Sequence, residues 1–268
     1  VRIQGADLQE IAKIRTWQEL LFPLHGKVER EYTAEAAAQT VWNTEIMELL
    51  QSLHEEKGAF LFRIEYKGSM DERKKREFVK NLPFLRLYTM EDERFVYRKE
   101  SIAASIAPVN AALIMQIAGD YLKENAQVLD PFCGVGTMLI ERKYFRSADP
   151  LYGVDIYAEG IQKARDNTAV TKMPIHYIAR DFFTFEHDYL FDELITDMPA
   201  SADEAFYRTF FKKAETLLKR GAVLVLYNRQ GTLLEEMCRR QNNLTILKTA
   251  VLNERQNSKV VVAKLQEA

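Results

Sequence analysis

An acid and two closely spaced glycines follow a short apolar segment near the middle of the chain. Residues 127–129 predict a strand that ends at Asp130, and Gly134 and Gly136 precede a helix-like stretch, Thr137–Tyr144. Glycine lets the backbone approach a ligand closely, and a helix start attracts negatively charged groups. A bare Gly-x-Gly fits a tight structural turn equally well. Neither Gly-x-Gly-x-x-Gly nor a phosphate-binding P-loop pattern is completed.

The residues around these glycines carry more information. Residues 130–137 are Asp-Pro-Phe-Cys-Gly-Val-Gly-Thr, and Met-Leu-Ile-Glu follows. This string resembles motif I of the THUMP-associated RNA methylases, a family that acts on guanines of tRNA and rRNA. The resemblance implies a class I methyltransferase domain with S-adenosylmethionine as its cofactor. It assigns cofactor binding to Asp130, Phe132, Cys133, Gly134, Gly136 and Thr137.

Two further acids end the next predicted strands. Asp155 lies about twenty residues beyond the glycines, where dinucleotide-binding folds carry the carboxylate that contacts the ribose. The resemblance gives Asp155 that role, with Ile156 beside it, and gives the adenine to Asp181 and Phe182. The structural alternatives are a helix N-cap for Asp155 and a surface turn for Asp181.

A segment upstream of the glycines also matches the family. Tyr97-Arg98 and residues 104–112 (Ala-Ser-Ile-Ala-Pro-Val-Asn-Ala-Ala) resemble its approach to motif I. The resemblance predicts that Ser105 contacts the cofactor. Without it, the stretch reads equally well as a capped helix with Pro108 in its first turn.

The predicted fourth strand ends in Asp197-Met198-Pro199-Ala200. Amino-group methyltransferases of this type carry Asn or Asp here, then Pro two residues later and an aromatic after it. The acid and a backbone carbonyl accept the hydrogens of the acceptor amine, so that catalysis is mainly positioning. Asp197 and Pro199 match and are the predicted catalytic residues, whereas Ala200 lacks the ring that would stack on the base. Phe206 or Tyr207 is a candidate substitute, and a domain that has lost transfer is the alternative.

The order of elements predicts how these residues are positioned. Strand-like segments alternate with helices from about residue 96, and two strand-like runs, Leu244–Leu252 and Ser258–Leu265, end the chain. This order predicts an α/β domain at 96–268, with a Rossmann-like seven-stranded methyltransferase sheet and a C-terminal antiparallel hairpin. A smaller α+β region at 1–95 precedes it.

Residues 1–95 are the predicted RNA-binding part. Ile11–Leu21 resembles the linker that precedes the THUMP module of the family. Arg63–Arg86 contains eight basic and four acidic residues, which suits a phosphate backbone. A solvated helix face is the alternative.

The length, net charge and residue counts of the chain limit its possible partners and location. The 268 residues carry a net charge of −2, so RNA would need a local basic patch. Two cysteines favour a reducing cytoplasm, the four histidines show no metal-ligand spacing, and no apolar run is long enough to span a membrane. Because the sequence begins at Val1, we expect it to be a piece of a longer protein.

The predicted function is therefore S-adenosylmethionine-dependent methylation of RNA, at N2 of a guanine in tRNA or rRNA. One alternative is a cofactor-binding but catalytically impaired module that binds RNA or a protein. Another is an enzyme whose acceptor is a protein or a small molecule.

Overall fold

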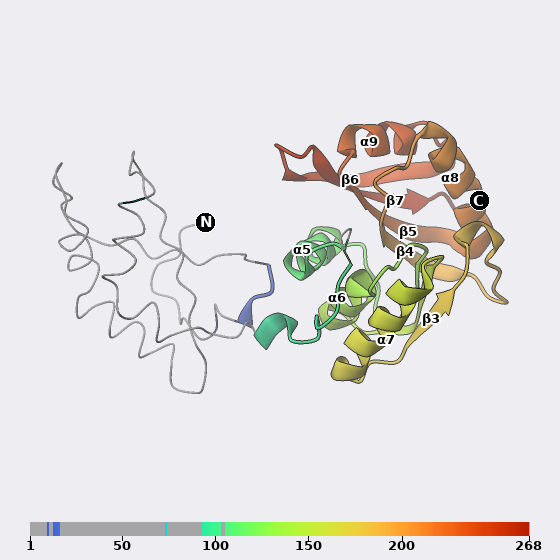
Figure 1. The fold of residues 1–268 in the computed structure, drawn as a ribbon. Helices are drawn as coiled ribbons and strands as arrows, with labels where there is room; N and C mark the ends of the chain where they lie inside the picture. The colour runs from blue at the N-terminus through green and yellow to red at the C-terminus, as the bar shows by residue number, and fades with distance from the viewer. Residues whose placement is uncertain (1–9, 11–12, 17–72, 74–92, 103–104, 268) are drawn as a thin grey trace. The chain divides into compact units, whose positions relative to one another are not determined.

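The computed structural model describes residues 10, 13–16, 73, 93–102 and 105–267 (Figure 1). The chain divides into two units, Val1–Arg94 and Phe95–Ala268. The second unit carries the fold described below. The predicted linker at Ile11–Leu21 and the basic stretch at Arg63–Arg86 lie almost entirely outside the described residues.

A seven-stranded sheet forms the centre of the second unit, in the order β3-β2-β1-β4-β5-β7-β6. The first five strands are parallel and the last two are antiparallel. This confirms the predicted Rossmann-like sheet with a C-terminal hairpin. The strands are β1 (Ala126–Asp130), β2 (Ala148–Asp155), β3 (Ile175–Ala179), β4 (Phe191–Asp197), β5 (Leu218–Asn228), β6 (Leu244–Asn253) and β7 (Ser258–Leu265).

Helices cover both faces of the sheet (Figure 1). The side chains of successive strand residues point to opposite faces of the sheet, and each face carries its own hydrophobic core cluster. Val128 lies in the first cluster and its neighbour Leu129 in the second. The first cluster is completed by α5 (Pro108–Ala118), α6 (Thr137–Phe145) and α7 (Ala158–Thr171). The second is completed by α8 (Glu204–Leu217) and α9 (Gly231–Arg239). Two 3-10 turns, η2 (Glu93–Phe95) and η3 (Phe182–Thr184), complete the described elements.

Two boundaries and one helix are not evident from the local sequence pattern. The strand β5 begins at Leu218, although the continuous apolar run starts only at Ala222. The helix α5 ends at Ala118, before Gly119, although apolar residues continue to Leu122. The helix α9 is short and begins with a glycine, a poor helix former.

A buried ion pair joins α6 to β4. The Arg142 Nε donates to Glu193 Oε2 at 2.7 Å, and both side chains are fully buried. Each partner is also hydrogen-bonded to backbone: Glu193 Oε1 accepts from the Lys123 N–H at 2.7 Å, and Arg142 Nη2 donates to the Lys123 carbonyl at 2.6 Å. Removing one partner of such a pair leaves an uncompensated charge in the interior.

Arg142→Met is therefore expected to lower the free energy of unfolding by about 3–5 kcal/mol, because Glu193 keeps its burial and loses its counter-ion. Urea denaturation measures this change. Arg208→Met, which removes an exposed arginine paired with Glu204, is the matched control and should cost less than about 1 kcal/mol. Equal costs for the two variants would contradict the role given to the buried pair.

Candidate active site

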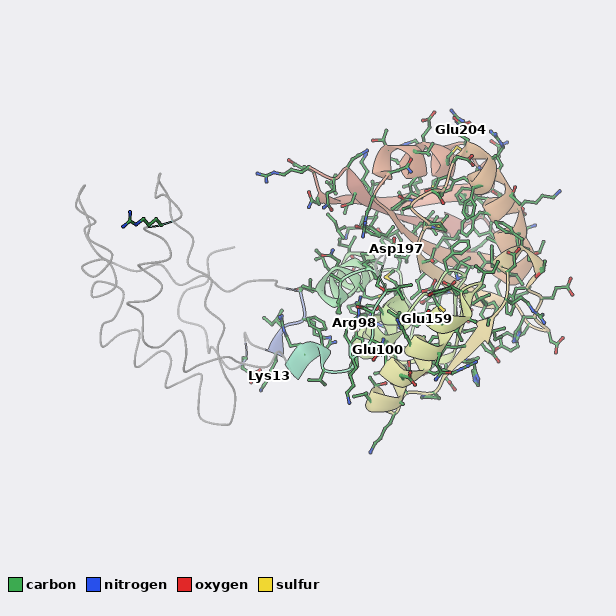
Figure 2. The ribbon with its side chains drawn as sticks, viewed as in Figure 1. Lys13, Arg98, Glu100, Glu159, Asp197 and Glu204 are labelled. Atoms are coloured by element: carbon green, nitrogen blue, oxygen red, sulfur yellow. The ribbon has the colours of Figure 1, made fainter. Side chains whose placement is uncertain are left out.

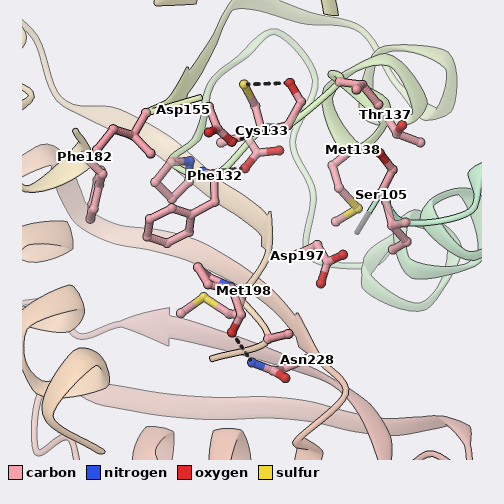
Figure 3. Close-up of a pocket in the computed structure, with 18 of the residues that line it drawn as sticks. Ser105, Phe132, Cys133, Thr137, Met138, Asp155, Phe182, Asp197, Met198 and Asn228 are labelled. Atoms are coloured by element: carbon pink, nitrogen blue, oxygen red, sulfur yellow. Dashed lines mark hydrogen bonds between the residues drawn. The ribbon is translucent and has the colours of Figure 1, made fainter. Parts of the chain in front are cut away.

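A cavity of about 480 Å³ lies where the parallel strands end (Figure 3). Its volume is typical of a small-molecule site. Loops that follow β1, β2, β3, β4 and β5 contribute to its walls. Twelve of the thirteen predicted site residues line it: Ser105, Asp130, Phe132, Cys133, Gly134, Thr137, Asp155, Ile156, Asp181, Phe182, Asp197 and Pro199. The thirteenth, Gly136, is not among the lining residues.

The two glycines of the loop after β1 act differently. Both have positive φ, 50° at Gly134 and 83° at Gly136, a conformation that favours glycine. A Cβ at Gly134 would meet only the tip of Ile102, at 3.9 Å, so this backbone faces open space in the cavity. A Cβ at Gly136 would overlap the Tyr177 hydroxyl. Gly134 therefore leaves room for a ligand, whereas Gly136 leaves room for a neighbouring side chain.

Asp155 fastens the end of β2 to this loop. Its Oδ2 accepts from the Gly134 N–H at 2.8 Å, and its Oδ1 accepts from the Tyr157 N–H at 2.9 Å. It does not cap α7, whose N-cap residue is Tyr157. A carboxylate has about four acceptor sites, so each oxygen can still accept a bond from a ligand.

Asp181 and Phe182 line the same cavity beyond β3. Asp181 caps the turn η3, since its carboxylate accepts from the Phe183 N–H at 2.9 Å. The structural alternative is therefore present in the geometry, and it leaves the second carboxylate oxygen available. Phe182 is buried, and its ring meets Phe132 edge-on with 5.5 Å between centroids.

Asp130 is the most deeply buried acid of the cavity. It is 1 % exposed, and its Oδ1 accepts from the Phe132 N–H at 3.2 Å. Its Oδ2 and the hydroxyl of Thr196 are buried without a hydrogen bond of ordinary geometry among the described residues. Burial raises the pKa of Asp130 to about 8, an effect that the Thr196 hydroxyl and the Phe132 amide only partly offset. A cationic ligand group at this oxygen would restore the ionised form.

The segment upstream of α5 is docked onto the glycine loop by buried polar groups. The Tyr97 hydroxyl donates to Glu141 at 2.6 Å, and Arg98 (Figure 2) donates to the Thr137 hydroxyl at 3.2 Å. Asn167 of α7, which is fully buried, bonds both the N–H and the C=O of Glu100 and the C=O of Val135. No local pattern around Asn167 indicates these contacts, because its partners lie 32 and 67 residues away in the chain.

Ser105 lies at the end of this segment and lines the cavity. Its hydroxyl accepts from the Ile102 N–H at 3.1 Å, which closes a short turn. It does not cap α5, whose N-cap residue is Ala107. The helix does begin at Pro108, as the alternative interpretation of this stretch expects, and the place of Ser105 on the cavity wall is also compatible with a ligand contact.

The loop Asp197–Ala200 is fastened to the segment after β5 at three successive residues. The Met198 N–H donates to the Tyr227 carbonyl at 2.8 Å, and the Asn228 amide donates to the Pro199 carbonyl at 3.3 Å (Figure 3). The Gln230 amide donates to the Ala200 carbonyl at 2.7 Å. We call Asp197–Ala200 the acceptor loop, and the segment Tyr227–Gln230 its brace.

Asn228 is the central residue of the brace. Its side chain is fully buried and also bonds the Tyr207 hydroxyl at 3.0 Å and the Gln230 N–H at 2.7 Å. The sequence suggested only a turn residue at this position. The structure instead gives Asn228 contacts with α8, the acceptor loop and the start of α9, which no local pattern could have indicated.

The carboxylate of Asp197 points into the cavity (Figure 3). Burial raises its pKa to about 7, and the nearby positive charge of Arg229 offsets part of that rise. Near neutral pH, Asp197 therefore exchanges between an acceptor-only carboxylate and a carboxylic acid that also donates.

The missing aromatic at Ala200 has one structural substitute. Phe206, at the start of α8, lines the cavity and packs against Phe132 with 5.6 Å between ring centroids. Tyr207 is wholly buried and bonded to Asn228, so it cannot present its ring to a ligand. Of the two candidates in the sequence, only Phe206 reaches the cavity.

The comparisons with known proteins agree with this site. The family model described as RMKL-like, methyltransferase domain matches residues 96–256. The chain belongs to this methyltransferase family. The predicted family resemblance is thereby confirmed, and S-adenosylmethionine is the methyl donor. No curated protein matches the sequence significantly.

Solved methyltransferase structures share the fold. TrmN from Thermus thermophilus superposes with a TM-score of 0.56 at 20% identity over 68% of this chain, which spans only 55% of the TrmN chain. An S-adenosylmethionine-dependent methyltransferase from Clostridium acetobutylicum gives 0.51 at 11% identity, over 61% of this chain and 94% of its own. N-methyltransferase NodS from Bradyrhizobium japonicum in complex with S-adenosyl-L-homocysteine gives 0.50 at 15% identity, over 59% and 86%. At these identities, the likeness concerns the fold.

In the part of the chain that the structure describes, no three histidine, cysteine or carboxylate residues cluster as a metal ion would require. No helix in the same residues is long and apolar enough to cross a membrane.

Asp130→Asn tests the unsatisfied acid. An ordinary pKa of 3.8 in the unfolded chain and about 8 in the fold means that the folded state holds the proton more tightly. The native carboxyl therefore loses stability as pH rises from about 4 to 8. The amide carries no charge, so the variant should be more stable than the native chain by roughly 2–5 kcal/mol at pH 8 and little different at pH 4.

Urea denaturation of the ligand-free protein at the two pH values measures this difference. Saturating S-adenosylhomocysteine should raise the melting temperature of the native chain and have a much smaller effect on Asp130→Asn, because the amide cannot pair with a cation. A variant that is destabilised at pH 8, or that binds the ligand normally, would contradict this account of Asp130.

Proposed function

We propose that this methyltransferase transfers the methyl group to an exocyclic amine of RNA, at N2 of a guanine in tRNA or rRNA. The proposal is supported above all by the acceptor loop. Asp197 and Pro199 occupy the positions of the amino-group methyltransferase motif and share one cavity with the residues of motif I. A loop that orients an acceptor amine can serve methyl transfer only if a methyl donor binds next to it.

The fit of the cofactor follows from the chemistry of the walls. S-adenosylmethionine carries an ammonium group, a sulfonium, a ribose and an adenine. The unsatisfied oxygen of Asp130 suits the ammonium, and the open backbone at Gly134 admits the methionine chain. Asp155, with Ile156 beside it, would accept from the ribose hydroxyls, while Asp181 and Phe182 would hold the adenine.

The bound cofactor supplies an electrophilic methyl group on sulfur. The protein orients the amine that receives it, and two hydrogens of that amine need acceptors. The brace already occupies the carbonyls of Pro199 and Ala200. The Met198 carbonyl and the Asp197 carboxylate remain as acceptors for the substrate. Their bonds would direct the nitrogen lone pair toward the methyl group that the bound cofactor supplies, and the proton that the amine loses would pass to the Asp197 carboxylate.

Phe206 supports a nucleobase as the substrate. A base must leave its stack to reach a cavity of this depth, and stacking on an aromatic ring compensates by roughly 1–3 kcal/mol per base. The ring of Phe206 is half-buried against Phe132 and Phe183, so it is held in place at the wall.

A cofactor-binding module without transfer activity is the second candidate. The exposed Ala200, in place of the aromatic, is the observation that favours it.

We further propose that residues 1–95 form an RNA-binding, THUMP-like part, on the strength of the basic stretch Arg63–Arg86. Both cysteines of the described chain are buried and unpaired, which suits the reducing cytoplasm that we propose as its location.

Transfer of labelled methyl from S-adenosylmethionine to unmodified total RNA tests the proposal. The native chain should label RNA, and nucleoside analysis should identify N2-methylguanosine. Asp197→Ala should reduce the rate at least about a hundredfold while S-adenosylhomocysteine still binds, since only the acceptor side is altered. Labelling of protein instead of RNA would show that the methyl acceptor is a protein. No labelling by a chain that binds the cofactor would support the non-catalytic module.

The pH dependence provides a second test. The ionised form of Asp197 is the one that only accepts hydrogen bonds, and its pKa in the ligand-free site is about 7. The kcat/KM for RNA at saturating cofactor should therefore rise with pH through a midpoint at or below about 7, because a nearby sulfonium favours ionisation. Asp197→Asn cannot titrate, so it should be slower by roughly ten- to a hundredfold at pH 8. Its kcat/KM should also lack the fall at low pH, which we call the acid limb of the profile. An unchanged acid limb in the variant would assign the titration to another group.

A further inference from the structure

The charges around the cavity are strongly unequal. Four carboxylates line it, those of Asp130, Asp155, Asp181 and Asp197, and Arg229 is the one cation among its lining residues. Four acids suit a cofactor with a sulfonium and an ammonium group. They oppose the approach of a polynucleotide, whose every linkage carries a negative charge. An RNA acceptor therefore needs a cation at the side of the cavity where it enters.

Arg229 lies on the acceptor side of this cavity. It follows β5 and belongs to the brace, between Asn228 and Gln230. Those two neighbours bond the carbonyls of Pro199 and Ala200. The backbone of Arg229 is consequently held beside the acceptor loop. Its long side chain is the part that can change conformation.

The side chain of Arg229 is exposed and without an ion pair or hydrogen bond in the part of the chain that the structure describes. By contrast, three arginines on or beside α8 and α9 are paired: Arg208 and Arg240 with Glu204, and Arg239 with Glu235. Arg229 is close enough to Asp197 to influence it but lies beyond ion-pair distance. A guanidinium left unpaired at the edge of a binding cavity is available for a ligand anion, and its planar fork matches a phosphate group.

We propose that Arg229 binds a phosphate that adjoins the acceptor nucleoside, and so admits RNA to a cavity that is otherwise acidic. The inference rests on the proposed function and names the group that recognises its substrate. It makes Arg229 a substrate-binding residue, separate from the cofactor side of the site. The competing explanation is that Arg229 serves only to keep Asp197 ionised.

Arg229→Gln in the full chain separates the two explanations. The assay is methyl transfer to unmodified RNA at pH 9, where Asp197 is ionised with or without the arginine. Losing one phosphate contact should raise the KM for RNA by about tenfold and should reduce the slope of log KM against log salt by about 0.7. The affinity for S-adenosylhomocysteine should stay within about twofold, and Arg229→Lys should recover part of the KM, because it restores the charge without the fork.

Arg220→Gln is the matched control. It removes the same charge near the opposite end of β5, where Arg220 lies 3.9 Å from Glu215. Its KM and salt slope should equal those of the native chain. If Arg229→Gln also matches the native slope and KM at pH 9, Arg229 does not bind the RNA phosphate.

The remaining outcomes are equally decisive. In one outcome, Arg229→Gln keeps the native salt dependence of KM, but its kcat/KM falls at a higher pH than that of the native chain. This result would show that Arg229 acts on Asp197 and would overturn the phosphate contact. If the native chain labels no RNA, the proposed function fails and the inference fails with it. If the native chain labels RNA normally and only the salt test is negative, the proposed function stands without Arg229.

Discussion

The strands β1 and β4 run side by side at the centre of the sheet, and the chain leaves them toward opposite edges. From β1 the order proceeds through β2 to β3, and from β4 through β5 to the hairpin. The loops at their carboxyl ends therefore diverge and open a crevice, the position at which open α/β sheets bind ligands. Asp130 ends one of these strands and Asp197 ends the other. The two acids line the same cavity because of this single adjacency.

The same crevice concentrates groups that are poorly satisfied in the protein alone. Asp130 and Asp197 both have raised pKa values because burial disfavours their charged forms. The stability of the folded chain comes from contacts made elsewhere, among them the buried pair of Arg142 and Glu193 that joins α6 to β4. Such an arrangement favours ligand binding over stability, since the ligand supplies the partners that the interior withholds.

Local sequence patterns were enough to predict the parts of the site that depend on local geometry. The acids at strand ends and the glycines after β1 follow from the alternation of strands and helices, and twelve of thirteen predicted residues meet in one cavity. The sheet and its hairpin were predicted for the same reason. The family resemblance gave those residues roles, which geometry alone could not.

The rest of the site depends on contacts between distant segments. Asn228 braces Pro199 across 29 residues, and Asn167 reaches Glu100 across 67. Nothing in the neighbourhood of either asparagine distinguishes it from an ordinary turn or helix residue. The boundary of β5 was missed for a related reason, because pairing with β4 extends the strand into residues with no strand pattern of their own. Phe206 was only one of two candidates until the burial of Tyr207 removed the other.

The brace has a consequence for how such a domain can evolve. It holds the acceptor loop through main-chain groups, the Met198 N–H and the carbonyls of Pro199 and Ala200. The side chain at position 200 is exposed and contributes nothing to that attachment. Mutation can therefore exchange this side chain without disturbing the loop. Position 200 is thus a point at which the wall of the cavity can change while the main-chain attachment of the loop stays the same.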